Sequence, residues 1–106
     1  MDDAQLIDNV AQALLLRRGI TWVPDAVFAA QMTQAAGAAI GLLRSHAGNP
    51  SLSFEEGEDF DLAVTCVWYL AENRRAEFLR EYGQDLIWLR AREAIKDGTD
   101  QDSDVS

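Results

Sequence analysis

The stretch that decides the fold is residues 59–73, which read Asp59-Phe-Asp-Leu-Ala-Val-Thr-Cys-Val-Trp-Tyr-Leu-Ala-Glu-Asn73. At about 100° per residue, the apolar side chains of this stretch surround most of the circumference of an α-helix. A helix that is apolar on nearly all sides is stable only when other helices cover it. We therefore predict an all-α fold with residues 59–73 as the central helix of a compact bundle.

Two segments of helical period precede the central helix, and each ends at a clear stop signal. Residues 3–18 carry their apolar side chains along one side and end at Gly19, which suits the left-handed position after a helix. Residues 24–47 begin at Pro24, whose missing N–H costs nothing at the first helical position. This second segment ends before the Gly-Asn-Pro run at 48–50, and a loop then leads to the central helix.

A last helical segment follows at residues 75–96, with its apolar stripe formed by Phe78, Leu79, Tyr82, Leu86 and Leu89. Gly83 either interrupts this helix or lies within it, so the prediction is a bundle of four to five helices. The single helical domain spans residues 1–97. Residues 98–106 have almost no apolar side chains, and we expect them to form a disordered acidic tail in the free protein.

The net charge of −9 is unevenly distributed along the chain. One acidic patch lies around the start of the central helix and contains Glu55, Glu56, Glu58, Asp59 and Asp61. The tail contributes Asp97, Asp100, Asp102 and Asp104. These residues make up the whole excess of the 18 acidic over the 9 basic side chains. Both acidic regions repel a phosphate backbone, so we expect no tight nucleic-acid binding. The acidic residues either keep the protein soluble and monomeric or take part in binding a partner.

Side chains suited to catalysis or metal binding are few. His46 is the only histidine, and Cys66, the only cysteine, lies in the most apolar helix, where its thiol should stay protonated. There is no zinc-type Cys/His spacing and no glycine-rich phosphate loop. Asp100, Asp102 and Asp104 alternate like calcium ligands, but the glycine and the later glutamate of a calcium loop are missing. We predict no catalytic residue, no metal and no cofactor.

The composition predicts a soluble, cytosolic protein. A single cysteine excludes an intramolecular disulfide, which fits a reducing compartment. The first residues are acidic where a secretory signal is basic. The longest charge-free stretch of the second half, residues 62–71, is far shorter than the roughly 20 residues of a membrane span, so we expect no membrane contact.

The last helix carries a candidate protein-binding surface. If this helix is continuous, Trp88 and Ile95 point about 160–180° away from the apolar stripe. A tryptophan one turn from an arginine, here Arg92, is a combination over-represented at protein interfaces. We predict that Trp88, Arg92 and Ile95 bind a partner; the alternative is that Trp88 covers another element of the same subunit.

A ridge of small side chains is a second candidate surface. Ala29, Thr33, Gly37 and Gly41 follow each other at spacing four. Each glycine inside a helix costs about 1 kcal/mol relative to alanine, so we expect the close approach of another backbone to compensate. That backbone belongs either to this chain or to a neighbouring subunit. Trp22, in the short turn between the first two helices, is a further interface candidate.

Two stretches together resemble a known family. Residues 19–28 read Gly-Ile-Thr-Trp-Val-Pro-Asp-Ala-Val-Phe and lead into a long alanine-rich helix. The second stretch, residues 61–78, includes the end of the central helix and contains a Tyr-x-x-x-Asn-Arg pattern at 69–74. The sequence Leu-Ile-Trp-Leu-Arg follows at 86–90. The chain resembles the small helical head–tail connector (head-completion or adaptor) proteins of tailed bacteriophages, with Tyr69, Asn73, Arg74, Leu89 and Arg90 as the matching residues. The resemblance spans about residues 19–96, and the long acidic loop before the central helix departs from it.

This resemblance implies a subunit that assembles into a homo-oligomeric ring between the portal protein and a tail or stopper protein. DNA would pass through the ring without specific binding. The protein would lie at the head–tail junction of the virion, and in the host cytoplasm during assembly. A ring contact is head-to-tail, so each subunit needs two different surfaces. The Trp88 surface would form one, and the small-residue ridge or the Trp22 region the other, while the acidic tail would order against a portal or tail protein.

A second hypothesis is a different kind of binding protein, a small acidic helical regulator that binds and masks a basic partner protein. Both hypotheses use acidic residues and an exposed helix face, so the sequence separates them poorly. An enzyme is not expected, because the sequence offers no pair of titratable side chains that can be placed in a common pocket.

Overall fold

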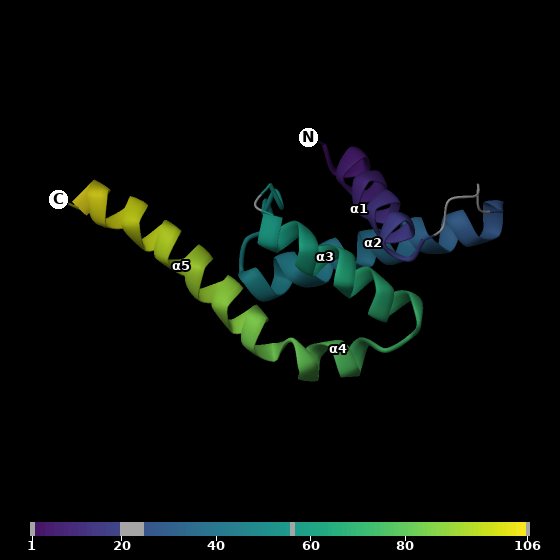
Figure 1. Cartoon of the computed structure of the whole chain (residues 1–106). Coiled ribbons are helices and arrows are strands. Elements are labelled where there is room, and N and C mark those ends of the chain that lie inside the picture. Colours follow the sequence, from purple (N-terminus) through teal and green to yellow (C-terminus); the bar gives the residue numbers. More distant parts are fainter. Residues whose placement is uncertain (1, 20–24, 56, 106) are drawn as a thin grey trace.

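In a computed structural model of the protein, α3 (Gly57–Ala71) occupies the central position predicted for residues 59–73. The structure describes residues 2–19, 25–55 and 57–105, and side chains up to Lys96. Over these residues every regular element is an α-helix (Figure 1). The other helices are α1 (Asp3–Arg17), α2 (Ala26–Ala47), α4 (Arg75–Glu81) and α5 (Gly83–Val105). The predicted all-α fold of four to five helices is confirmed.

Helices α2 and α3 share the centre of the bundle. α3 contacts α1, α2 and α4, whereas α2 contacts α1, α3 and α5. The largest completely buried side chains come from α1, α2, α3 and α4, and they are Phe78, Leu43, Val10, Val64, Val67 and Cys66. Full burial of an aliphatic or aromatic side chain of this size contributes about 1.5–3 kcal/mol, so this core supplies the main favourable term for folding.

Aspartate side chains cap two helices. Asp2 accepts a hydrogen bond from the backbone N–H of Gln5 at 2.8 Å, and Asp25 accepts one from Phe28 at 2.8 Å. Such caps satisfy N–H groups that have no partner in the first helical turn. The cap at Asp25 means that α2 begins at Ala26, two residues later than predicted. The predicted start at Pro24 lies outside the described residues.

Residues in the left-handed conformation end three helices. Gly19 follows α1 with a φ of 73°, as predicted, and Gly48 follows α2 with a φ of 69° at the predicted stop of that helix. Asn73 (φ 61°) plays the same part after α3, where the N–H of Arg74 donates to the carbonyl of Tyr69 at 2.7 Å. Asparagine tolerates this conformation better than most side chains. The chain therefore turns back sharply after α3, and α4 packs against it.

The last predicted helix is two helices, because a turn interrupts it just before Gly83. α4 ends at Glu81, and Tyr82 lies in the turn. Three aromatic rings meet at this corner: Phe78 stacks on Tyr82 at 5.1 Å between centroids, and Tyr69 lies 5.7 and 5.8 Å from these two rings. Each such pair contributes about 0.5–1.5 kcal/mol beyond its burial, so the cluster stabilises the change of direction into α5 (Figure 1).

The C-terminal half of α5 points away from the other helices (Figure 1), and the molecule measures 56 × 30 × 18 Å. The backbone of residues 98–105, where the sequence predicts a disordered tail, continues this helix at its projecting end. A segment with almost no apolar side chains has little to bury against the bundle, and this position agrees with that property.

α2 is, among the described residues, the one helix long and apolar enough to cross a membrane by length and composition. The prediction of no membrane contact considers only the second half of the chain, where the longest charge-free stretch is residues 62–71, so it does not identify α2 as a candidate. A core helix of a soluble protein meets the same two criteria, and here α2 contributes to the core the buried side chains Met32, Ala35, Ala36, Ala39, Ile40, Leu43 and Ala47.

The thiol of Cys66 should be unreactive in the folded protein. Its side chain is completely buried in α3, and burial raises the pKa of the thiol to about 12. The thiolate fraction is then about a thousandfold lower than for a free cysteine at the same pH. We expect iodoacetamide to leave the native protein unmodified at mildly alkaline pH and to label it fully in guanidinium chloride, as measured by mass spectrometry. Fast labelling of the native protein would show that α3 is not covered.

Candidate protein-binding surfaces

The outer face of α5 exposes large apolar side chains. Trp88 and Ile95 are each 68% exposed, whereas Leu86 and Leu89 on the inner face are buried. Trp88 and Ile95 therefore point away from the apolar stripe, as predicted. Other elements of the chain leave most of the Trp88 side chain uncovered, although it borders α3 across a groove.

A groove of about 460 Å³ lies between α3 and α5, and we call it the α3–α5 groove. Trp88 and Ile95 form its α5 side together with Ala91, and Leu62 lines it from α3. Two exposed carboxylates, Glu58 and Asp85, also line it, together with Leu89 and the paired side chains of Asp59 and Arg92. The groove is thus apolar with acidic side chains along it.

A charged pair at this groove joins α5 to α3. The guanidinium of Arg92 donates two hydrogen bonds to the Asp59 carboxylate, at 2.8 and 2.6 Å. The Asp59 side chain is only 7% exposed and that of Arg92 29%. Such a two-point pairing fixes orientation as well as distance. The sequence predicts Arg92 at a partner interface; in the structure its guanidinium is paired with Asp59 of the same chain, beside Trp88 in the same groove.

A second buried carboxylate extends the pair into a network. Glu93 accepts hydrogen bonds from the Asn49 side-chain amide at 2.8 Å and from Arg92 at 3.2 Å, and Lys96 lies 3.3 Å from it. Burial raises the pKa of Glu93, but the hydrogen bonds from Asn49, Lys96 and Arg92 together outweigh it and hold this pKa below the ordinary value. The network connects α5 to the loop after α2.

The five predicted carboxylates do not form one acidic patch. Asp59 is buried against Arg92, and Asp61 pairs with Arg17 of α1. Glu55 and Glu58 are exposed, while Glu56 lies outside the described residues. The sequence treats these carboxylates as equivalent neighbours, but α3 turns them to different sides and arginines from two other helices neutralise two of them.

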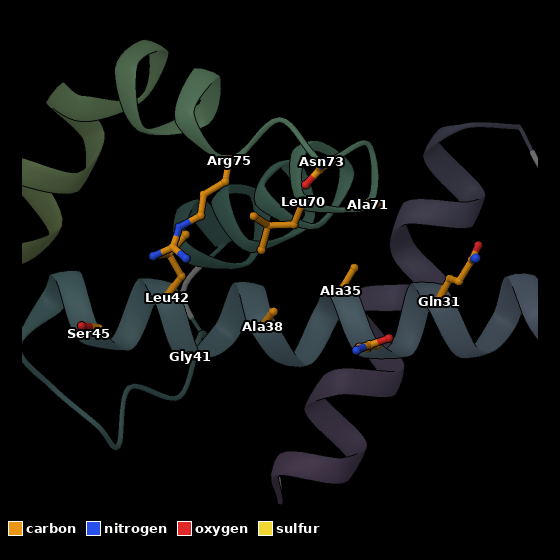
Figure 2. Close-up of a pocket in the computed structure, with 11 residues that line it drawn as sticks. Gln31, Ala35, Ala38, Gly41, Leu42, Ser45, Leu70, Ala71, Asn73 and Arg75 are labelled. Atoms are coloured by element: carbon orange, nitrogen blue, oxygen red, sulfur yellow. The ribbon is translucent and has the colours of Figure 1, made fainter.

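A second groove, of about 700 Å³, lies between α2 and the turn from α3 to α4 (Figure 2), and we call it the α2–α4 groove. Its α2 side is made mostly of small and amide side chains: Gln31, Gln34, Ala35, Ala38, Gly41, Leu42 and Ser45. The opposite side includes Leu70, Asn73 and Arg75. Figure 2 shows the Arg75 side chain reaching across towards Leu42.

The two helical glycines have different surroundings. A Cβ atom at Gly37 would meet Cδ1 of Ile7 at 3.7 Å, an ordinary van der Waals contact with α1. A Cβ atom at Gly41 would meet nothing within 4 Å, because this residue lies in the open α2–α4 groove. The close approach of another backbone, predicted as compensation for both glycines, is therefore absent around Gly41 in the described part of this subunit.

The remaining candidates give little further chemistry. Trp22 lies outside the described residues. His46 is half-buried near the end of α2. Among the described side chains, no group of three or more His, Cys, Asp or Glu comes together in a way that could hold a metal ion. The tail carboxylates at 97–104 belong to the part of α5 whose side chains are not described.

Comparison with protein-family models, with curated proteins and with solved structures found no match for this chain. A functional assignment therefore has to rest on the residues and surfaces described above. Of the residues that line the two grooves, the sequence identified Trp88 and Ile95 but not Arg75 or Asp85. A single charged residue has no sequence signal that places it in a groove, because the groove is formed by helices that are distant in the sequence.

The Arg92–Asp59 pair should contribute to stability. Replacing Arg92 by Met leaves a buried carboxylate without its cation, and we expect a loss of about 2–3 kcal/mol in the free energy of unfolding, since the pair is partly exposed. Urea unfolding followed by circular dichroism measures this loss. Arg90→Met, at an exposed position of the same helix, is the matched control and should change stability by less than about 0.5 kcal/mol. Equal effects of the two substitutions would contradict this role of the pair.

Acid should weaken the Glu93 network. The pKa of Glu93 is lower in the folded than in the unfolded chain. The ionised Glu93 side chain therefore stabilises the fold at pH values above 4.5, its ordinary pKa, and this contribution is lost as the pH falls through the pKa of the folded chain. We expect Glu93→Gln to lower the melting temperature at neutral pH and the difference from wild type to narrow at acidic pH. Thermal melts across that range test this, with Glu55→Gln, an exposed position, as the control. A constant difference would exclude Glu93 as the titrating group.

Proposed function

We propose that this protein is a structural assembly subunit of a tailed bacteriophage, a head–tail connector that forms a homo-oligomeric ring between the portal protein and a tail or stopper protein. The resemblance of residues 19–96 to such connectors motivates the proposal. The observation that carries it is the pair of open grooves on an all-α subunit, one beside Trp88 and one over Gly41. A ring needs two different surfaces on each subunit, and these grooves share no residue.

The chemistry of the described residues supports a binding role over a catalytic one. The buried carboxylates Asp59 and Glu93 are occupied by Arg92, Asn49 and Lys96. The buried thiol of Cys66 has a raised pKa. A net charge of −9 suits a channel through which DNA slides, because such a subunit neutralises few phosphates. In this proposal the protein lies at the head–tail junction of the virion and in the host cytoplasm during assembly.

A second candidate function is a small acidic regulator that binds and masks a basic partner. The exposed carboxylates Glu58 and Asp85 beside the apolar α3–α5 groove favour it. Gene context discriminates the two candidates: neighbouring genes for portal, capsid and tail proteins support the connector, whereas a gene for a basic partner beside this one supports the regulator.

Negative-stain microscopy of the protein mixed with its cognate portal tests the connector. We expect rings on the portal with wild-type protein. Trp88→Ala should reduce ring occupancy about tenfold or more, because a central tryptophan is a typical hot spot, while far-ultraviolet circular dichroism stays unchanged since the side chain is exposed. Ile87→Ala, also exposed on α5 but outside the groove lining, is the matched control. A portal that stays bare with wild-type protein would contradict the proposed function.

A further inference from the structure

The α5 side of the α3–α5 groove is a row of exposed side chains with one acidic end. Asp85, Trp88, Ala91 and Ile95 follow each other at spacings of three and four, so they lie along one side of the helix. All four are exposed, and we call them the α5 ridge. From Asp85 to Ile95 the ridge is about 15 Å long at 1.5 Å per residue. It presents an aromatic and an aliphatic side chain to solvent, preceded by a carboxylate.

The α2–α4 groove has the opposite features. Its floor contains Ala38 and Gly41, and beyond the neighbouring residues and backbone of α2 itself no described atom lies within 4 Å of the position that a Cβ atom of Gly41 would take. From Gln31 to Ser45 it follows α2 for about 21 Å, which is long enough for the α5 ridge. A floor of small side chains lets a helix approach closely and leaves room for large side chains from outside.

The charges of the two surfaces are complementary. Arg75 is exposed and is the only charged side chain among the residues that line the α2–α4 groove. Arg17, Arg44, Arg74 and Arg92 form ion pairs, but for Arg75 the described part of the chain shows none. Asp85 at the start of the α5 ridge likewise has no ion pair with a described residue. The Arg75 guanidinium in the α2–α4 groove and the Asp85 carboxylate on the α5 ridge can therefore form an ion pair between two copies of the chain.

We propose that the α5 ridge of one copy of this protein docks into the α2–α4 groove of a second copy, with Trp88 over Ala38 and Gly41 and Asp85 beside Arg75. The pairing rests on the proposed function, because it names the two surfaces by which ring subunits contact each other. The contact is heterologous, so it leaves a free ridge and a free groove at the two ends of every dimer and propagates to a ring or a filament. Opposite charges at the contact also fix the direction in which the ridge lies.

A symmetric contact through the same ridge is unfavourable. Two facing α5 ridges that run in parallel would bring the exposed Asp85 carboxylates of both copies together, and like charges placed opposite each other weaken an interface. Two ridges that run antiparallel would place each Asp85 opposite Ile95 of the other copy, where the ridge offers no cation. Two facing α2–α4 grooves would bring together small side chains and two Arg75 guanidiniums, with no large apolar side chain to fill the space. The ridge-into-groove pairing is the one that satisfies both shape and charge.

Disulfide trapping tests the pairing even when association is weak. The buried Cys66 is inert, so an introduced cysteine is the reactive thiol of each chain. A chain with Ala91→Cys on the ridge is mixed at high concentration with a chain carrying Ala38→Cys in the groove, under mild oxidation. We expect the mixed disulfide dimer to form about tenfold faster than in a mixture of Ala91→Cys with Gln12→Cys, an exposed position on α1. Equal rates would overturn the pairing.

Charge reversal then tests the Asp85–Arg75 contact in the same assay. Asp85→Arg in the ridge chain should slow trapping about tenfold, because it places two cations together. Arg75→Asp in the groove chain should restore the rate, since the pair is then reversed. Far-ultraviolet circular dichroism of each variant serves as the folding control. A reversed pair that traps as slowly as the single variant would overturn the predicted orientation of the ridge.

The failures of the two proposals are distinguishable. If rings form on the portal but the Ala91→Cys and Ala38→Cys chains are trapped no faster than the Gln12→Cys control, the pairing of surfaces is wrong and the connector function stands. If trapping is fast and responds to charge reversal but the portal stays bare, self-association stands and the connector function fails. Trapping of two Ala91→Cys chains faster than the mixture would show a symmetric contact and would also overturn the pairing.

Discussion

α3 has apolar side chains in almost every direction, so it has to be shielded from water on several sides at once. That constraint explains most of the arrangement. α1 and α2 cover two sides of α3, and the left-handed turn at Asn73 brings α4 back onto a third. The alanine-rich face of α2 allows close packing with small side chains. Only α5 is left without a place on α3, and it packs on α2 instead.

The position of α5 then depends on charge. Because its backbone does not pack directly on α3, the two-point pair of Arg92 with Asp59 is the described contact that joins these helices, and Glu93 with Asn49 joins α5 to the loop after α2. Charge-assisted pairs of this kind are specific in geometry, whereas apolar contacts are not. The buried Leu86 and Leu89 turn one side of α5 inward, and the network joins the helix at defined points to α3 and to the loop after α2.

The side chains that stay exposed and have no ion pair within the described part of the chain define its surfaces for binding a partner. Arginines that lie near carboxylates are engaged within the subunit, while Arg75 and Asp85 lie on two separate surfaces. A subunit with one apolar ridge and one groove lined by small side chains is suited to repeated head-to-tail contacts. This is the physical basis on which the connector proposal and the ridge-into-groove pairing depend.

The sequence by itself determined the helices, because periodicity and stop signals such as Gly19 and the Gly-Asn-Pro run at 48–50 act over a few residues. It also determined that Trp88 and Ile95 lie opposite the buried stripe of α5, since both faces belong to one helix. Only the tertiary structure decided which charges remain available. Arg92 and Asp59 are 33 residues apart, and Asp61 and Arg17 are 44 apart, so their pairing depends on how α3 packs against α5 and α1. The same long-range packing opened the groove around Gly41, because an unfilled space between helices has no signature in any one of them.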